Sequence, residues 1–479
     1  MNRGGGGDPP RRSHVVVVGG GITGLAAAHR MVEARPDGAV RVTLVESEDR
    51  LGGKVETGRC GEWTVELGPD GFLNRADEAR LLCAAVGLGD QLVPAVTQRA
   101  GIWVGGRLRW LPEGQVLGVP LRLGALRRSR LVSTAAVVRA ALEPWVPRRA
   151  DGPDDPLGPI LRRRLGREIF ERLVDPLLSG IYAGPAESMS LGAVAPQLLE
   201  ALRTHGSLRT GLRRLVPAAV SAGGPEGRPE PVFLTVGGGL TRLVDRLAAA
   251  LPAGSVRLGC AATVVEPAAG GGWVVATTTG GLDPADAVIV TAPAFSAAPL
   301  IAGVNPAAAG CLRDLPYASV ATITLAYPAA SVPALPAASG FLVPRGERRR
   351  VTACTFLGRK WPHLAADDVC LLRASVGRYG QRGDLDLPDA QLAAEVHLEL
   401  RRALGLRGAP TAITVRRWPR ALPQYLAGHL GRVEALDTAL TATPGLLVAG
   451  AALRGVGLPA CIGEGRRAGE RALACPAAG

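Results

Sequence analysis

The chain has 479 residues and carries a formal net charge of +13 at pH 7. This length exceeds a single hydrophobic core, so two or three domains with ample volume for a buried cofactor are expected. All basic side chains other than Lys54 and Lys360 are arginines, and their clusters lack interleaved aromatic residues. We therefore predict no nucleic-acid partner and interpret most clusters as solvated faces, with a minority able to pair with carboxylates. The clusters are Arg127-Arg128, Arg162-Arg163-Arg164, Arg348-Arg349-Arg350 and Arg416-Arg417.

The eight cysteines never form a Cys-x-x-Cys pair, and no histidine cluster accompanies them. This pattern favours reduced thiols over a disulfide framework or metal ligands, so we predict no metal and a cytoplasmic location. Residues 1–12 are rich in glycine and arginine and contain no apolar segment, which predicts a disordered tail rather than an export signal.

The first predicted element is a dinucleotide-binding βαβ unit. An apolar run precedes Gly19, Gly21 and Gly24, and Glu46 ends the next apolar run, 22 residues beyond Gly24. Gly19 permits a tight turn, Gly21 lets the backbone approach a pyrophosphate, and Gly24 lets the helix pack closely on the strand. The helix N-terminus offers free N–H groups to the pyrophosphate, and Glu46 stands where an acceptor for the ribose hydroxyls belongs. The turn also contains Gly20, Ile22 and Thr23.

Two further turns indicate which nucleotide is bound. Ser47 follows Glu46, and an Arg-x-Gly-Gly turn then brings Arg50, Gly53 and Lys54, which a nicotinamide dehydrogenase does not need. This turn resembles the second signature of flavin amine oxidases, which lies along the diphosphate of FAD. A third turn, Gly68-Pro69-Asp70-Gly71, resembles the segment that those enzymes place near the isoalloxazine ring. Ordinary turn chemistry is the alternative for each turn alone, but the three in this order predict FAD.

The middle of the chain alternates between helix and strand patterns. A helix is predicted at 78–86, a β-hairpin at 101–111 around Gly105-Gly106, and a block of helices at 120–221. After a glycine- and proline-rich linker at 222–231 come a strand at 232–236, a helix at 240–251 and strands at 255–265, 273–279 and 287–291. This succession resembles a second pass of the flavin domain, in which Val264 would lie beside the adenine.

The C-terminal third predicts a second sheet and a return to the nucleotide fold. Strands with one clear helix, 387–404, are expected between 306 and 424 and indicate a substrate-facing α+β unit. A buried strand at 444–450 and a helix at 460–472 then present another helix N-terminus, suited to the flavin ring. Prolines interrupt the apolar stretches 287–312 and 318–344, so we interpret them as strands and loops and expect at most a peripheral membrane contact.

Together these patterns predict an α/β fold with a discontinuous Rossmann-like FAD-binding domain, an α+β substrate domain and an inserted helical subdomain that roofs the active site. The predicted segments are the tail at 1–12, the FAD-binding domain at 13–98, 232–305 and 425–475, the substrate-domain hairpin at 99–119, the helical insert at 120–221 and the substrate domain at 306–424.

Three longer blocks, 175–184, 422–429 and 454–462, are more specific than the nucleotide motifs. With them the chain resembles the protoporphyrinogen/coproporphyrinogen oxidases of haem biosynthesis, in the form found in Gram-positive bacteria, over about residues 13–473. It departs from that pattern at Leu453, where a tyrosine is usual, at Ala460, where an acid is usual, and at Asp70-Gly71, where Asp-Ser is common. The departures concern the positioning of the flavin.

The resemblance implies FAD as the cofactor and the conversion of coproporphyrinogen III to coproporphyrin III by three two-electron oxidations. Each oxidation would pass a hydride from a bridge carbon to flavin N5, and O2 would reoxidise the flavin to give H2O2. A transient contact with a downstream ferrochelatase is a further expectation. The FAD-binding residues so implied are Gly19, Gly20, Gly21, Ile22, Thr23, Gly24, Glu46, Ser47, Arg50, Gly53, Lys54, Gly68, Pro69, Asp70, Gly71, Val264, Trp418, Val456, Gly457 and Leu458.

This chemistry requires no paired carboxylates or His/Asp constellation, and none is evident, so we assign no catalytic side chain. His429 lies within a family block and either touches ligand or, as we favour, is structural. Arg107, Arg109 and Arg345 are candidate partners for the propionates of the substrate. The alternatives are a protoporphyrinogen IX oxidase, a carotenoid or amine oxidase, and a non-catalytic carrier of flavin or porphyrin.

Overall fold

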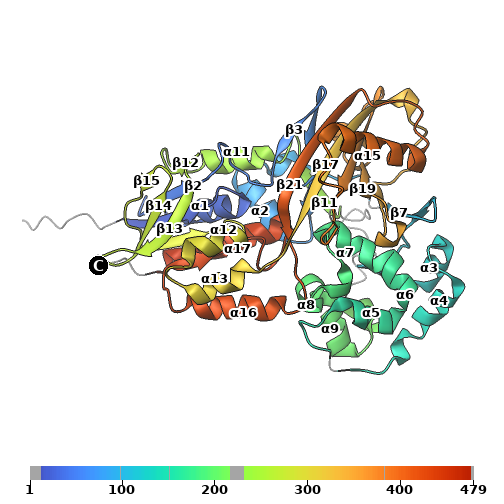
Figure 1. Cartoon of the computed structure of the whole chain (residues 1–479), viewed down its shortest axis with the longest axis horizontal. Coiled ribbons are helices and arrows are strands. Elements are labelled where there is room, and N and C mark those ends of the chain that lie inside the picture. The colour runs from blue at the N-terminus through green and yellow to red at the C-terminus, as the bar shows by residue number, and fades with distance from the viewer. Residues whose placement is uncertain (1–11, 98, 150, 216–230, 382, 476–479) are drawn as a thin grey trace, which may run out of the picture.

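A computed structural model describes residues 12–97, 99–149, 151–215, 231–381 and 383–475. The chain forms a mixed α/β fold (Figure 1), with a parallel sheet and its helices at one end, a larger sheet at the other end and a group of helices below that larger sheet. The predicted tail, apart from Arg12, and most of the predicted linker lie outside the described residues.

The parallel sheet has five strands contributed by distant parts of the chain, in the order β12-β2-β1-β16-β22. Their bounds are Val256–Arg257 (β12), Val40–Val45 (β2), Ser13–Val18 (β1), Ala287–Val290 (β16) and Leu446–Val448 (β22). Valines of β1 alternate between two hydrophobic clusters, one on each face of the sheet. Both faces are therefore covered, as expected for a parallel sheet whose crossover connections place helices on each side.

One face of this sheet carries α1 (Ile22–Ala34) and α17 (Leu458–Leu473), which lie side by side. Their close approach depends on small residues, because a Cβ on Gly465 would collide with the carbonyl oxygen of Thr23, and one on Gly469 would lie 2.8 Å from that of Ala27. Two further helices, α2 (Asp77–Ala85) and α11 (Thr241–Ala249), join the same core and match the predicted helices.

The opposite face carries α12 (Ala294–Ile301), α13 (Pro306–Arg313) and α16 (His429–Leu440), together with the antiparallel sheet β13 (Ala262–Pro267), β14 (Trp273–Thr277) and β15 (Gly280–Gly281). Two predictions are wrong here. The stretch 287–312 begins with the predicted strand, β16, but the rest forms two helices rather than a loop, and the predicted strand 255–265 divides into β12 and β13, which belong to different sheets. The helix α13 packs against α12 and α16 and therefore belongs to the group of helices that covers the parallel sheet.

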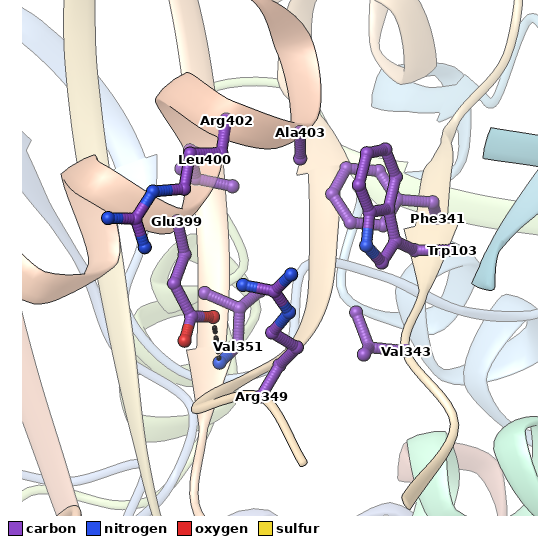
Figure 2. A pocket seen from close by; sticks show the side chains of 9 residues that line it. All are labelled: Trp103, Phe341, Val343, Arg349, Val351, Glu399, Leu400, Arg402 and Ala403. Carbon is purple, nitrogen blue, oxygen red and sulfur yellow. Dashed lines mark hydrogen bonds between the residues drawn. The ribbon is translucent and has the colours of Figure 1, made fainter. Parts of the chain in front are cut away.

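The larger sheet has seven strands in the order β21-β17-β20-β19-β18-β7-β8. Their bounds are Ala412–Pro423 (β21), Tyr317–Pro328 (β17), Val369–Val376 (β20), Val351–Phe356 (β19), Gly340–Leu342 (β18), Ala100–Val104 (β7) and Arg107–Trp110 (β8). The predicted hairpin is confirmed as β7–β8, and the predicted helix 387–404 as α15 (Asp389–Leu404), which packs on one face of the sheet. A cavity of about 20 Å³ between α15 and the sheet (Figure 2) has room for about one water molecule, too little for a cofactor.

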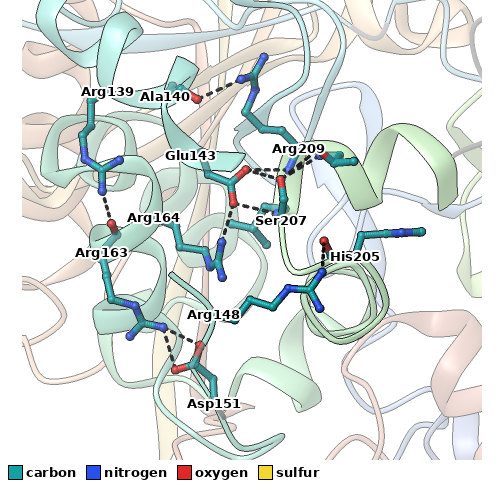
Figure 3. A network of polar contacts seen from close by, with 12 residues as sticks. Arg139, Ala140, Glu143, Arg148, Asp151, Arg163, Arg164, His205, Ser207 and Arg209 are labelled. Carbon is teal, nitrogen blue, oxygen red and sulfur yellow. Dashed lines mark hydrogen bonds and ion pairs between the residues drawn. The ribbon is translucent and has the colours of Figure 1, made fainter. Parts of the chain in front are cut away.

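The helical insert is built from α3 (Leu123–Ser129), α4 (Thr134–Ala141), α5 (Leu157–Leu165), α6 (Arg167–Ile169), α7 (Asp175–Tyr182), α8 (Leu191–Val194), α9 (Pro196–His205) and α10 (Leu208–Leu215). Its core contains a fully buried carboxylate, Glu143 (Figure 3), which pairs with Arg164 at 3.0 Å and accepts from the Ser207 hydroxyl at 2.7 Å. The backbone N–H groups of Leu208 and Arg209 also donate to it, so Glu143 caps the N-terminus of α10. The prediction of a solvated Arg162–Arg164 face is therefore wrong at Arg164, whose side chain is 2% exposed.

Shorter elements connect these units. They are the sheets β5 (Phe72–Leu73), β11 (Phe233–Val236) and β6 (Leu92–Pro94), β3 (Thr57–Cys60) with β4 (Trp63–Glu66), and β9 (Gln115–Val116) with β10 (Val119–Pro120), and the helix α14 (Leu357–Lys360). Within the described parts of the chain, every helix is too short or too polar to cross a bilayer. All eight cysteines are free thiols.

Candidate cofactor-binding site

The first glycine turn lies at the carboxyl end of β1, directly before α1. Gly19 has a φ of +109°, a conformation open chiefly to glycine, and a Cβ on Gly24 would collide with the Gly19 carbonyl oxygen. By contrast, a Cβ on Gly21 would have no neighbour within 4 Å. The turn is therefore tight at both ends and faces open space in its middle, where free N–H groups at the start of α1 suit an anion.

Glu46 stands beside this turn. Its Oε2 accepts from the Gly20 N–H at 2.6 Å, and its Oε1 accepts from the Glu48 N–H at 2.9 Å and from the Ser47 hydroxyl at 3.0 Å. These bonds fix the carboxylate against the glycine turn, and its remaining lone pairs can accept from ribose hydroxyls.

The Arg-x-Gly-Gly turn packs directly on the first turn. Gly52 donates to the Gly20 carbonyl oxygen at 2.9 Å, and a Cβ on Gly53 would lie 3.4 Å from the Cα of Gly21. Arg50 closes the second turn by donating to the Gly53 carbonyl oxygen at 2.6 Å, and it pairs with Glu56 at 3.0 Å. Two turns about thirty residues apart thus form one continuous backbone surface.

Lys54 extends this surface to the N-terminus of α17. Burial lowers the pKa of Lys54, and the other described group that affects this pKa is the Cys461 thiol, whose own pKa burial raises to about 11. The Cys461 thiol also forms a hydrogen bond with the Thr23 hydroxyl, and the Cys461 backbone N–H donates to the Gly457 carbonyl oxygen at 3.0 Å. Lys54 forms no ion pair with any described residue, so this covered ammonium favours a bound anion such as a diphosphate.

The third turn sits between Lys54 and the seven-stranded sheet. A Cβ on Gly68 would collide with the Lys54 carbonyl oxygen, and Trp418 of β21 donates its Nε1–H to the Leu67 carbonyl oxygen at 2.9 Å. A Cβ on Gly71 would lie 2.7 Å from the Leu234 carbonyl oxygen. There is no room for side chains at either glycine, so the course of the turn is fixed by packing.

Asp70 anchors the same turn from behind. It accepts from Lys360 at 2.8 Å and from the Trp361 indole at 3.3 Å, and Arg373 lies 4.0 Å away. Burial acts to raise the pKa of Asp70, but the two cations outweigh it and hold that pKa at about 2. The carboxylate is therefore charged at all physiological pH values and locks the turn to α14 and β20.

Glu66 lies on β4, close to the polar residues around Asp70. It accepts from the Leu240 N–H at 2.6 Å and from the Thr57 hydroxyl at 3.0 Å, and burial raises its pKa to about 7. Glu66 and Asp70 border a cavity of about 340 Å³, together with Trp63, Trp361 and His363.

The α17 turn is held by aromatic side chains. The Tyr425 hydroxyl donates to the Ala451 carbonyl oxygen at 2.6 Å and accepts from the Gly455 N–H at 2.7 Å. His429 is buried, stacks on Tyr425 at 4.0 Å and bonds to the Leu453 carbonyl oxygen at 2.8 Å. These contacts agree with a structural role for His429, and they hold the backbone that precedes Val456, Gly457 and Leu458.

The structure brings most of the predicted residues together and leaves a few apart. Val264 lies on β13 with 37% of its surface exposed, and the segment before it is bonded to this site. The Cys260 N–H donates to the Glu46 carbonyl oxygen at 2.8 Å, and the Glu46 N–H donates to the Arg257 carbonyl oxygen at 2.9 Å. Arg107 is exposed and Arg109 is half-buried on β8. The anchors Lys360, Trp361 and Arg373 were not predicted, because single polar residues on distant strands carry no local motif.

The family model of the flavin containing amine oxidoreductases matches residues 22–473, which include the end of the first turn, the whole of the second and third turns, and α17. The chain belongs to this family. Its cofactor is therefore FAD, and the surface described above, with its close-packed glycines and unpaired Lys54, fits the diphosphate of that cofactor.

Relatives and solved structures agree with this assignment. The chain is 35% identical over 456 residues, or 95% of its length, to a coproporphyrinogen III oxidase of Bacillus subtilis, 96% of which is covered. It is 37% identical over 450 residues to one of Mycobacterium tuberculosis, covering 94% of each. A crystal structure of a protein described as a putative protoporphyrinogen oxidase from Exiguobacterium superposes with a TM-score of 0.83 at 33% identity, covering 97% of this chain and 99% of the other. Cyclohexylamine oxidase of Brevibacterium oxydans, at 16% identity and a TM-score of 0.69, shares the fold over 97% of this chain and 99% of its own.

Proposed function

We propose that this enzyme is an oxidase of haem biosynthesis that converts coproporphyrinogen III to coproporphyrin III. The observation that carries the proposal is the identity of 35% and 37%, over 94–95% of the chain, to relatives that bear that name. The reaction comprises three two-electron oxidations, with O2 as the electron acceptor and H2O2 as the by-product. FAD, when bound, supplies hydride acceptance and reaction with O2, while the protein supplies binding, orientation and electrostatics.

The residues that would hold FAD divide by the part of the cofactor they suit. Glu46 and Ser47 suit the ribose, and Val264 the adenine. The turns 19–24 and 50–54, with the ammonium of Lys54, suit the diphosphate. The turn 68–71, Trp418 and the segment 456–458 suit the ring, and Asp70 with Lys360 keeps the backbone of that turn in place. By this division the discontinuous unit formed by 13–98, 232–305 and 425–475 is the FAD-binding domain, and α13 joins it through its packing on α12 and α16.

The substrate would then lie between the seven-stranded sheet and the helical insert, with α7 as part of its roof. Gly180 of α7 faces Leu342 of β18, since a Cβ on that glycine would lie 3.1 Å from the leucine side chain. A transient contact with a ferrochelatase that consumes the product, and a cytoplasmic location, belong to the same proposal.

Protoporphyrinogen IX is the second candidate substrate. The chain is 28% identical, over 92% of its length, to a chloroplastic protoporphyrinogen oxidase of Arabidopsis thaliana, so the two activities occur within one set of relatives. Coproporphyrinogen III carries four propionates, whereas protoporphyrinogen IX carries two. Because arginine pairs well with carboxylates, an arginine-rich protein suits coproporphyrinogen III.

The test is steady-state oxidation of both porphyrinogens by purified, FAD-loaded enzyme, followed by porphyrin fluorescence and H2O2 release. We expect a higher kcat/KM for coproporphyrinogen III, because discrimination is a difference in transition-state binding. Equal kcat/KM values, or a higher kcat/KM for protoporphyrinogen IX, would favour protoporphyrinogen IX as the substrate. A yellow protein that oxidises neither compound would instead be a carrier, and the proposal would fail.

A further inference from the structure

The junction between α7 and the seven-stranded sheet brings two arginines, Arg345 and Arg378, near the carboxyl group of Asp175. Arg345 begins the turn that follows β18, Arg378 follows β20, and Asp175 is the first residue of α7. Arg378 is buried and donates to the carbonyl oxygens of Val343 at 2.6 Å and Arg349 at 3.3 Å. Asp175 accepts from the Ala186 N–H at 3.1 Å. These two side chains are thereby held in place by the backbone around them.

Arg345 differs from both neighbours. Its guanidinium makes no hydrogen bond or ion pair with any described residue, and its Nε and Nη2 atoms are buried. Nε and Nη2 form the side-on edge of a guanidinium, which matches the two oxygens of a carboxylate. A buried donor without an acceptor destabilises a protein, so this edge favours an incoming acceptor. The residue as a whole is only half-buried, which leaves it reachable.

The charges at the junction favour an anion. Burial lowers the pKa of Arg345 and, with the charge of Arg345 added, lowers that of Arg378 to about 10, so both remain cationic at neutral pH. Asp175 is the acid that faces both guanidiniums, and burial raises its pKa. Asp384 and Glu399 also act on Arg378 and offset its charge, whereas Asp175 is the one described acid that acts on Arg345. Arg345, without a hydrogen-bonded acceptor, is therefore the group at this junction that suits a carboxylate.

The length of α7 connects this junction to the cofactor site. At its C-terminal end, the Tyr182 carbonyl oxygen accepts from Gln424 at 2.7 Å, and the Tyr182 ring lies 5.6 Å from that of Tyr425. Tyr425 in turn holds the backbone before Val456. The eight residues of α7 rise about 12 Å, so this helix links the junction at Asp175 to the aromatic contacts beside the turn that suits the flavin ring.

We propose that Arg345 is a specificity-determining residue whose Nε–Nη2 edge binds a propionate of the porphyrinogen, with Arg378 adding positive charge and Asp175 opposing it. This inference rests on the proposed function. Of the three candidate arginines, it assigns Arg345 to the substrate. It assigns no substrate contact to Arg107 and Arg109, which lie on the β7–β8 hairpin.

The test compares two ligands that differ in charge and not in ring structure. FAD-loaded wild type, Arg345→Met and Asp175→Asn are titrated with coproporphyrin III and with its tetramethyl ester in the same detergent, and binding is followed by porphyrin fluorescence. We expect Arg345→Met to weaken binding of the acid about tenfold or more and to change ester binding less than about twofold. Asp175→Asn should tighten binding of the acid, because it removes the opposing carboxylate and keeps an acceptor for the Ala186 N–H.

Arg348→Met is the matched control, since Arg348 is an exposed arginine just after the same turn. Equal losses for acid and ester in Arg345→Met, or no loss for either, would overturn the inference. If Arg345→Met does not retain FAD, Arg345→Lys replaces it, and a loss confined to the acid is still required. Turnover of coproporphyrinogen III by the wild type tests the proposed function separately, so failure of the one is distinguishable from failure of the other.

Discussion

The turns around α1 and the core of the helical insert are both tightly built, but they are held together by opposite means. In the turns, missing side chains allow close contact, as at Gly24 against Gly19 and Gly53 against Gly21. In the insert, a buried carboxylate and a buried guanidinium, Glu143 and Arg164, join three segments of the chain. The first region leaves backbone donors and a cation, Lys54, free for a ligand, whereas the second satisfies its charges internally. Substitutions should therefore affect ligand binding in one region and stability in the other.

The sharpest test of this contrast is Gly21→Leu. A side chain there meets no protein atom within 4 Å, and the φ of −69° suits any residue, so the fold should persist while FAD binding is abolished. Flavin absorbance of the purified variant measures occupancy, and circular dichroism measures folding. Gly310→Leu in α13, also without a neighbour within 4 Å, is the control and should stay yellow. A yellow Gly21→Leu protein would remove the first turn from the cofactor site.

In the insert, Glu143→Ala should leave Arg164 buried without a partner and uncap α10. Breaking a buried pair in this way typically destabilises a protein by about 3–5 kcal/mol, which denaturant unfolding followed by a probe in the insert would measure. The double variant Glu143→Leu with Arg164→Met should be less destabilised than Glu143→Ala. A change in the single variant below about 1 kcal/mol would show that the network contributes little.

The pH dependence of Asp70 gives a smaller effect on the cofactor side. Its folded pKa of about 2 lies below the reference value of 3.8, so its contribution to stability is present above about pH 4 and is lost as the pH falls through 2. The shift corresponds to about 2 kcal/mol. The unfolding free energy of Asp70→Asn should therefore differ from that of wild type by about this amount at pH 5 and converge with it near pH 2. Parallel curves would contradict the assigned ion pairs.

Glu66 should titrate in the opposite sense. Its pKa is raised to about 7, so the folded state favours the protonated form, and stability falls as the pH rises from about 4.5 through 7. Glu66→Gln should abolish this decline between pH 5 and pH 8, as measured by urea unfolding. An unchanged pH profile in the variant would show that another group titrates.

Lys54→Met should separate ligand binding from stability. The apoprotein should be as stable as wild type or more stable, since a covered ammonium without a counter-ion is removed, while FAD affinity should fall about tenfold. Calorimetric titration of apoprotein with FAD measures the affinity. Unchanged affinity would place the diphosphate elsewhere.

The smallest effect is expected at the exposed pair Arg167–Glu171 on the insert, which lies close in sequence to the buried pair. Arg167→Ala should change stability by less than about 1 kcal/mol, because solvent screens such pairs. A loss as large as that of Glu143→Ala would mean that burial does not distinguish the two ion pairs.

The turns of the cofactor site were predictable because their chemistry is local. Gly19, Gly24 and Gly53 are required by backbone conformation and close approach, and those constraints act within a few residues along the chain. Glu46 was predictable for a related reason, since the length of one βαβ unit sets its distance from the glycines. The helices α2 and α15 and the β7–β8 hairpin were also predictable, from the periodic spacing of hydrophobic residues and from the turn residues.

The tertiary structure alone decided which partner each charged group has. Arginines look alike in sequence, yet Arg164 is buried against Glu143, Arg373 lies beside Asp70, and Arg345 is left without an acceptor. Each outcome depends on which distant segment supplies a carboxylate and whether water is excluded there. The sequence by itself therefore determined the cofactor class and its glycine-lined turns, while long-range packing decided which charges are satisfied internally and which remain for a ligand.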